Sequence, residues 1–168
     1  MSRTKKLVFL SLLSALALVV YVIEAQIPLP IPIPGVKLGL SNMISLTTLL
    51  VFGPIECLIV LVIRIFLGSI LTGSFSSLLF SLSGGLISNL GMIGLYLIFG
   101  DYISIWVISV IGSILHNIGQ LLIAALIIQN LKIYYYLPIL LVSAIITGFF
   151  VGLGSNFLSN HLNKLKYN

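Results

Sequence analysis

The chain opens with MSRTKKLVFLSLLSALALVVYVIEAQIPLPIPIPG at residues 1–35, a pattern typical of a protein inserted in a membrane. Cations within residues 3–6 precede an apolar run that continues to Ile23 and is followed by alternating prolines. About 20 apolar residues in a helix cross the hydrocarbon core of a bilayer, so a transmembrane helix is predicted over residues 7–27. A cleaved signal peptide would end its apolar run near Ala15–Ala17, and the continuation beyond that point favours an uncleaved helix.

The rest of the chain has the same character. Hydrophobic residues make up 60% of the 168 positions and charged residues only 7%, whereas a soluble domain has roughly 45–50% and 25%. Prolines, glycines and polar residues divide the apolar sequence into six segments, at 7–27, 38–52, 55–72, 75–99, 102–129 and 133–158. We therefore expect an all-α integral membrane protein with six transmembrane helices, in which residues 1–168 form a single transmembrane domain.

The charges indicate how these helices are oriented. The formal net charge is +5, but the cations are too few and too scattered to form a nucleic-acid-binding face. They gather before the first apolar segment and, at Lys164 and Lys166, after the last. Cationic flanks usually stay in the cytoplasm. Both termini are therefore expected inside, which requires an even number of spans and agrees with six.

Polar side chains within the predicted spans lie between the middle and the outer end. An ionised side chain at the centre of a bilayer costs at least about 2.5 kcal/mol on insertion scales, so it needs a partner, a cavity or a function. This distribution predicts a substrate-binding pocket open to the outside, formed by Glu24, Lys37, Asn42, Arg64, Asn89, His116, Asn117 and Gln120. Arg64 and Lys37 would compensate negative charge on a small anionic ligand, and the other side chains would form hydrogen bonds with it.

Several of these residues also have a structural interpretation. Gly112, His116 and Gln120 recur every four residues and therefore share one helix face. Imidazole and amide groups in membranes often hydrogen-bond neighbouring helices, so His116 and Asn117 would hold helices together under this alternative. For Arg64 the alternative is a pair with Glu24 or with a backbone carbonyl.

Three further features suggest how helices and loops meet. A dense series of small residues predicts close helix packing along the fourth segment, at Ser77, Ser81, Gly84, Gly85, Ser88, Asn89, Gly91 and Gly94. Alternating prolines favour an extended segment at Pro28, Pro30, Pro32, Pro34 and Gly35. This segment is either a lid over the pocket or a plain connector. Ser11 and Ala15 form a small-residue pair where another helix, of this chain or of a partner subunit, can dock.

Some chemistry is excluded or made improbable. A single cysteine, Cys57, forms no intramolecular disulfide or cysteine-rich metal site, and we expect it to be buried as a small hydrophobic residue. No glycine-lysine phosphate loop is present, so ATP hydrolysis by that route must come from a partner. We expect no metal and no cofactor in this chain, and no enzymatic activity of its own.

Four short motifs, taken in order, resemble a known family: PGVKLGLSN at 34–42, RIFLG at 64–68, FSLSGG at 80–85 and HNIGQ at 116–120. They are similar to the Gx transporter family, also called heptaprenyl diphosphate synthase component I, over nearly the whole chain. That family resembles the substrate-binding S components of energy-coupling factor (ECF) transporters. The resemblance implies a six-helix bundle in the cytoplasmic membrane of a bacterium, with termini inside, a ligand site near the outer surface and a first loop that caps it.

The resemblance also implies partners. An S component associates with a membrane coupling subunit and two ATPase subunits, which use ATP, and here Ser11 and Ala15 would make the contact. The ligand would be a flavin, an isoprenoid or a quinone precursor. Two alternatives are a non-catalytic membrane component associated with heptaprenyl diphosphate or menaquinone synthesis, and a structural subunit of a flavin-linked extracellular electron transfer system. Prenyl diphosphate synthases hold magnesium with aspartate-rich motifs, and Asp101 is the only aspartate here.

Overall fold

The computed structural model describes residues 2–27, 39–100 and 102–167, and all regular secondary structure within them is helical. The expected all-α class is therefore confirmed. In chain order the elements are α1 (Arg3–Glu24), α2 (Asn42–Phe52), α3 (Pro54–Thr72), α4 (Phe75–Phe99), α5 (Ile105–Ile128), the 3-10 helix η1 (Leu131–Tyr136) and α6 (Leu137–Tyr167).

Five helices have the length and composition to cross a membrane: α1, α3, α4, α5 and the continuous helix formed by η1 and α6. Large apolar side chains cover their outer faces, with Ile70 73% and Leu126 71% exposed, as expected where lipid is the solvent. The chain is thus a multi-pass membrane protein. The remaining helix, α2, has 11 residues, which at 1.5 Å per residue reaches about half-way through a bilayer core.

Several predicted helix bounds differ from the structure. The first helix, expected over 7–27, spans Arg3–Glu24. The second helix begins at Asn42 and not at residue 38, because Gly39 has a φ of 84°, a left-handed conformation that a continuous helix does not allow. The last helix continues beyond residue 158 to Tyr167. The polar residues after 158 predict the end of the membrane span, but a helix can continue into water after its apolar part has ended. The proline segment 28–35 lies outside the described residues.

Tight turns connect successive helices. Gly53 has a φ of 109° and ends α2, and Pro54 follows it as the first residue of α3, where its missing N–H has no helical acceptor. Gly73 ends α3 in the left-handed conformation, with a φ of 61°. These short turns make α2 and α3, and then α3 and α4, antiparallel neighbours.

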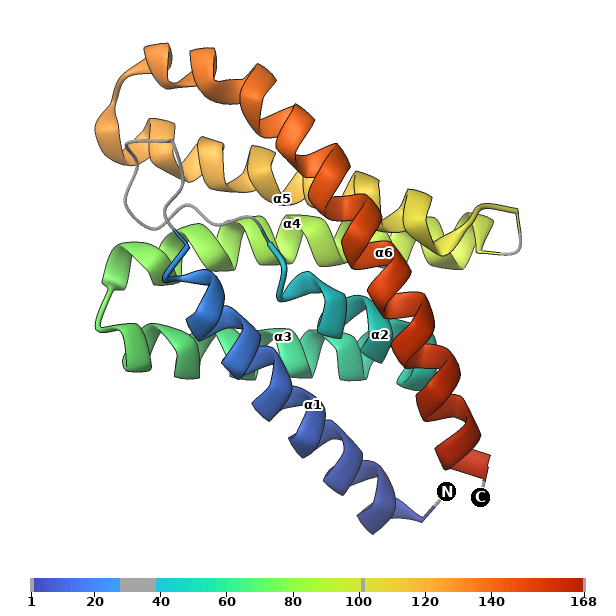
Figure 1. Ribbon diagram of the computed structural model, residues 1–168. Helices are drawn as coiled ribbons and strands as arrows, with labels where there is room; N and C mark the ends of the chain where they lie inside the picture. The colour runs from blue at the N-terminus through green and yellow to red at the C-terminus, as the bar shows by residue number, and fades with distance from the viewer. Residues whose placement is uncertain (1, 28–38, 101, 168) are drawn as a thin grey trace.

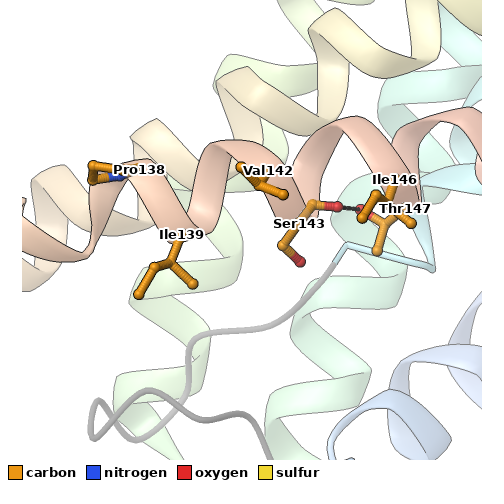
Figure 2. A pocket seen from close by; sticks show the side chains of 6 residues that line it. All are labelled: Pro138, Ile139, Val142, Ser143, Ile146 and Thr147. Atoms are coloured by element: carbon orange, nitrogen blue, oxygen red, sulfur yellow. Dashed lines mark hydrogen bonds between the residues drawn. The ribbon is translucent and has the colours of Figure 1, made fainter.

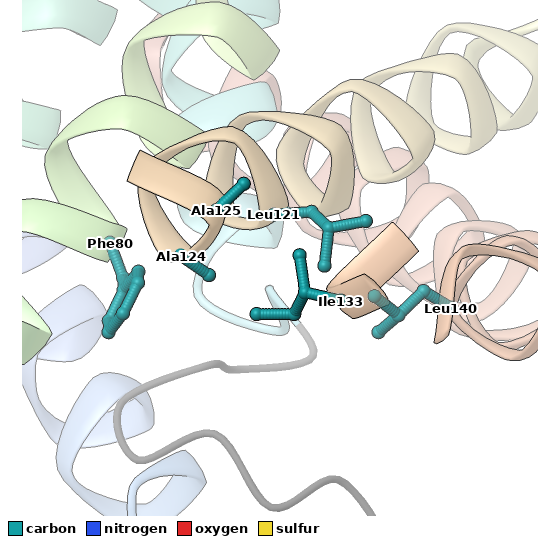
Figure 3. Close-up of a cluster of buried hydrophobic side chains, with 6 residues drawn as sticks. All are labelled: Phe80, Leu121, Ala124, Ala125, Ile133 and Leu140. Atoms are coloured by element: carbon teal, nitrogen blue, oxygen red, sulfur yellow. The ribbon is translucent and has the colours of Figure 1, made fainter. Parts of the chain in front are cut away.

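The helices are arranged with α3, α4 and α5 side by side, while α1 and α6 cross them obliquely (Figure 1). Both termini lie at the end of the bundle that also carries the α4–α5 turn (Figure 1). At the opposite end, a core of apolar side chains joins α4, α5, η1 and α6 (Figure 3); it consists of Phe80, Leu121, Ala124, Ala125, Ile133 and Leu140.

Close packing of α4 against α5 agrees with the small-residue series predicted along α4. A Cβ atom added to Gly84 would lie 2.8 Å from the carbonyl oxygen of His116, and one added to Gly119 would lie 2.9 Å from the Cα of Gly84. Neither position has room for a larger side chain. At Gly94, by contrast, an added Cβ would meet nothing within 4 Å, so the predicted close contact does not extend that far along the helix.

Candidate functional site

Eight buried polar side chains gather between α1, α2, α3, α4 and α5. Each is at most 4% exposed, and they are Glu24, Ser41, Asn42, Arg64, Ser88, Asn89, His116 and Gln120. We call this group the polar cluster. It includes six of the eight residues predicted to bind substrate, and it brings them together from separate elements.

Glu24 and Arg64 are linked through the segment that precedes α2. The Glu24 carboxylate, at the end of α1, accepts a hydrogen bond from the Gly39 N–H and another, at 3.3 Å, from the Ser41 N–H. The Arg64 guanidinium donates through Nη1 to the Ser41 hydroxyl oxygen. Ser41 therefore bridges the anion and the cation, where the sequence allowed a direct pair or a carbonyl partner.

The segment Gly39–Asn42 also lies against α5. A Cβ atom added to Gly39 would be 3.1 Å from Cδ2 of His116 and 3.2 Å from Nδ2 of Asn42. Glycine is needed at this position both for its left-handed backbone and for this close approach. Non-helical backbone is thus inserted among the helices at the level of Arg64, the eleventh residue of the 19-residue α3.

The two asparagines of the polar cluster bond to α4 and its neighbours. Asn42 Nδ2 donates to the Ser88 hydroxyl oxygen at 3.3 Å. Asn89 Nδ2 donates to the Gly85 carbonyl at 2.9 Å, and its Oδ1 accepts from the Cys57 thiol at 3.0 Å. Cys57 is fully buried, as expected from the sequence, but it also has this polar contact.

On α5, His116 and Gln120 face the same side and contact each other. Their Nε2 atoms are 3.0 Å apart, and the tautomer of the imidazole decides which of them donates. This confirms the face predicted from their four-residue spacing. Gly84 on α4 makes room for both side chains, since a Cβ there would lie 2.9 Å from Cγ of Gln120.

Asn117 points away from the polar cluster. Its Nδ2 donates to the Leu140 carbonyl of α6 at 2.9 Å, so the side chain joins α5 to α6. This geometry favours the structural alternative that the sequence left open. Lys37, the other residue outside the polar cluster, lies outside the described part of the chain.

Some buried polar atoms have no hydrogen-bond partner among the described residues. In and beside the polar cluster these are Arg64 Nε, Asn42 Oδ1 and Ser45 Oγ. A buried donor or acceptor without a partner costs about 1–3 kcal/mol. Polar groups of a ligand or of water that donate to Asn42 Oδ1 and accept from Arg64 Nε would remove that cost.

Sequence reasoning missed Gly39, Ser41 and Ser88 as parts of this site. A glycine shortly before a Ser-Asn pair at the start of an apolar segment is a signal for a turn followed by a helix start. That signal could have placed Ser41 and Asn42 at the same helix end. It could not have placed them beside Arg64, because the pairing depends on how distant helices pack.

Surface grooves lie outside the polar cluster, and two of them have volumes of about 440 and 520 Å³. One, of about 440 Å³, runs between α1 and α3 and is lined by Leu7, Leu10, Ser11, Ser14, Ala15, Leu18, Ile59, Ile63 and Leu67. It therefore contains the predicted partner-contact pair. The other, of about 520 Å³, follows α6 and is lined by Pro138, Ile139, Val142, Ser143, Ile146 and Thr147 (Figure 2). There the Thr147 hydroxyl donates to the Ser143 carbonyl at 2.8 Å, so that hydroxyl is already bonded within its own helix.

Metal ligands do not gather in the described ranges, where no group of three or more His, Cys, Asp or Glu side chains could hold a metal ion. Comparison with known proteins gives one match. The family model described as heptaprenyl diphosphate synthase component I matches residues 13–158, which include every residue of the polar cluster. No match was found among curated proteins or among solved structures.

Proposed function

Because the chain belongs to the heptaprenyl diphosphate synthase component I family and is a multi-pass membrane protein, we propose that it is a membrane-embedded binding subunit of an ECF-type importer. It captures a small molecule, such as a flavin, an isoprenoid or a quinone precursor, and has no catalytic role of its own. The observation that carries this proposal is the polar cluster, with its unpartnered donor on Arg64 and unpartnered acceptor on Asn42.

A membrane protein keeps an ionisable side chain among its helices at an energetic cost, so such a residue marks a functional site by default. In the polar cluster that cost applies to Arg64 and Glu24, which are 1% and 3% exposed. Packing alone would be served as well by apolar residues of similar volume. A ligand that uses the two unpartnered groups gives a reason for their burial.

The connectivity supports import as the direction of transport, with the termini proposed to lie in the cytoplasm. α1 begins at the end of the bundle with the termini and runs towards the opposite end (Figure 1). With the termini in the cytoplasm, a ligand would enter from the outside, and the proline segment 28–35 would cover it as a lid. Site-specific labels on Leu29 or Ile31 should respond to a bound ligand under this proposal.

Energy for release into the cell would come from partners. The groove between α1 and α3 is apolar and contains Ser11 and Ala15, which suits a helix of a membrane coupling subunit. Two ATPase subunits attached to that coupling subunit would hydrolyse the ATP. We place docking in this groove because small side chains let two helices approach closely in a membrane.

Copurification tests the proposal directly. The protein is purified from its native membrane together with any coupling subunit, and retained small molecules are identified by native mass spectrometry. We expect a bound ligand in the wild-type protein, its loss in Arg64→Gln, and its retention in Glu56→Gln, a carboxylate paired with Lys6 away from the polar cluster. A folded wild-type protein with neither ligand nor coupling subunit would end the importer proposal.

The family name favours a second candidate, a membrane component associated with heptaprenyl diphosphate or menaquinone synthesis. In that case the chain would recruit a catalytic synthase to the membrane and leave the prenyl chemistry to it. Coexpression with the synthase should then change the length of the prenyl product or the membrane-bound fraction of the enzyme. An importer would change neither.

A further inference from the structure

We infer that Glu24 determines which ligand charge the polar cluster accepts, and that the ligand group held beside Arg64 is uncharged. The inference rests on the proposed function in one respect, namely that the polar cluster binds a small molecule. The inference differs from the sequence-based expectation of an anionic ligand, in which Arg64 had no counter-charge other than the ligand.

The first argument is the charge of the polar cluster. Among the described residues that form it, Arg64 is the one cation and Glu24 the one anion, if His116 is neutral. Ser41 joins them, since its N–H donates to Glu24 and its hydroxyl accepts from Arg64. The guanidinium therefore has its counter-charge within the chain, and the described residues of the polar cluster carry no net charge when His116 is neutral.

The second argument concerns what a ligand anion would find there. Glu24 already takes the backbone N–H groups of Gly39 and Ser41, two donors that would otherwise be free to hold an anion. A phosphate or carboxylate beside Arg64 would put a second negative charge near Glu24. In a low-dielectric interior two like charges sharing one cation strongly disfavour each other.

An uncharged group avoids this repulsion and still has partners. Arg64 Nε can donate and Asn42 Oδ1 can accept, and both atoms lack partners among the described residues. An amide, imide or similar group supplies both an acceptor for Arg64 Nε and a donor for Asn42 Oδ1. Binding it leaves the balance between Glu24 and Arg64 intact.

Removing the Glu24 charge tests the inference, with inorganic pyrophosphate as the anionic probe. Wild type, Glu24→Gln and Glu24→Gln/Arg64→Gln are reconstituted in nanodiscs, and thermal unfolding is followed against pyrophosphate concentration. We expect no saturable rise in unfolding temperature for wild type, a saturable rise for Glu24→Gln over the same concentration range, and loss of that rise in the double variant.

Glu56→Gln is the matched control, because it removes a carboxylate paired with Lys6 and leaves the polar cluster unchanged. It should behave as wild type. The inference is overturned if wild type binds pyrophosphate as tightly as Glu24→Gln, if Glu24→Gln does not bind it, or if Glu56→Gln gains the same affinity.

A second measurement covers the case in which Glu24→Gln folds poorly. Arg64→Gln and Glu24→Gln should each lower the unfolding temperature, and the double variant should lose less than the sum, because neither charge is then left alone. Additive losses would contradict the pairing. Native mass spectrometry separates this inference from the proposed function. If the retained ligand carries a phosphate or carboxylate and is lost in Arg64→Gln, the inference is wrong, whereas the proposal of import is still supported.

Discussion

Gly119 brings the backbone of α5 into direct contact with α4 at Gly84. The two helices meet there without any intervening side chain, since an added Cβ would be 2.9 Å from Cα of Gly84 and 3.0 Å from the Ser83 carbonyl oxygen. Both atoms belong to the backbone and cannot rotate away. Without a hydrophobic driving force between helices in lipid, such close packing contributes much of the association energy.

Gly119→Ala should therefore destabilise the protein, whereas Gly94→Ala should not. Overpacking costs about 1–3 kcal/mol, while alanine in an open helix position is more favourable than glycine by about 1 kcal/mol. The free energy of unfolding in bicelles, measured with increasing SDS, should fall for Gly119→Ala and stay level or rise for Gly94→Ala. Equal effects of the two substitutions would contradict this account of the α4–α5 contact.

Asn117 provides a second prediction at this scale. Asn117→Ala removes the hydrogen bond to the Leu140 carbonyl and should lower the free energy of unfolding by about 1 kcal/mol, the usual range for such bonds in membranes. Ligand retention, measured by native mass spectrometry, should be unchanged, whereas Asn42→Ala should reduce it. If Asn117→Ala lost ligand with no loss of stability, its assignment to α5–α6 packing would be wrong.

At the scale of elements, α2 and its preceding segment hold the site together. Glu24, at the end of α1, bonds the segment 39–41, and Ser155 on α6 donates to the Met43 carbonyl at 3.0 Å. The first turn of α2 is thus fastened from two sides. A short helix in this position contributes less to spanning the membrane than to presenting Ser41 to Arg64 and Asn42 to Ser88.

The groove between α1 and α3 allows a prediction at this scale. Under the proposal that a coupling subunit docks there, Ala15→Trp should fill the groove and abolish copurification with that subunit, because Ala15 is exposed and lines the groove. Stability should hardly change, since the new ring replaces lipid contact. Leu126→Trp, at a position 71% exposed on α5, is the matched control and should keep the partner. Loss of the partner in both variants would remove the argument for this groove.

Sequence periodicity predicted the helices well where glycine and proline punctuate them. The bounds of α4 were found because Gly73 and Ser74 stop the preceding helix. It also predicted that His116 and Gln120 share a face. It could not separate Asn117 from them, because periodicity tells which residues lie together but not which neighbour that face contacts. The link from Glu24 through Ser41 to Arg64 depends on packing between distant elements, which no local pattern encodes.

For the whole molecule, the testable property is the side of the membrane on which each end lies. α1 begins and α6 ends at one end of the bundle, and the turn after α5 lies at the other end (Figure 1). Ser2 caps the start of α1, Lys164 is in the last turn of α6, and Gln129 caps the end of α5. In a Cys57→Ser background, single cysteines at residues 2 and 164 should react with an impermeant maleimide from the cytoplasmic side only, and one at 129 from the outside only. Reaction of residues 2 and 129 from the same side would overturn this topology.

Residues 39–41 form a turn outside the regular helices at the depth of Arg64, with their carbonyls bonded to the first residues of α2. Such backbone is tolerated within a membrane only against protein or water, never against lipid chains. If the segment moves aside to admit a ligand, the space behind it must hydrate, and closing must expel that water again. Occupancy of the open form should then depend on water activity, so that excluded osmolytes such as sucrose shift the protein towards its closed, dehydrated form.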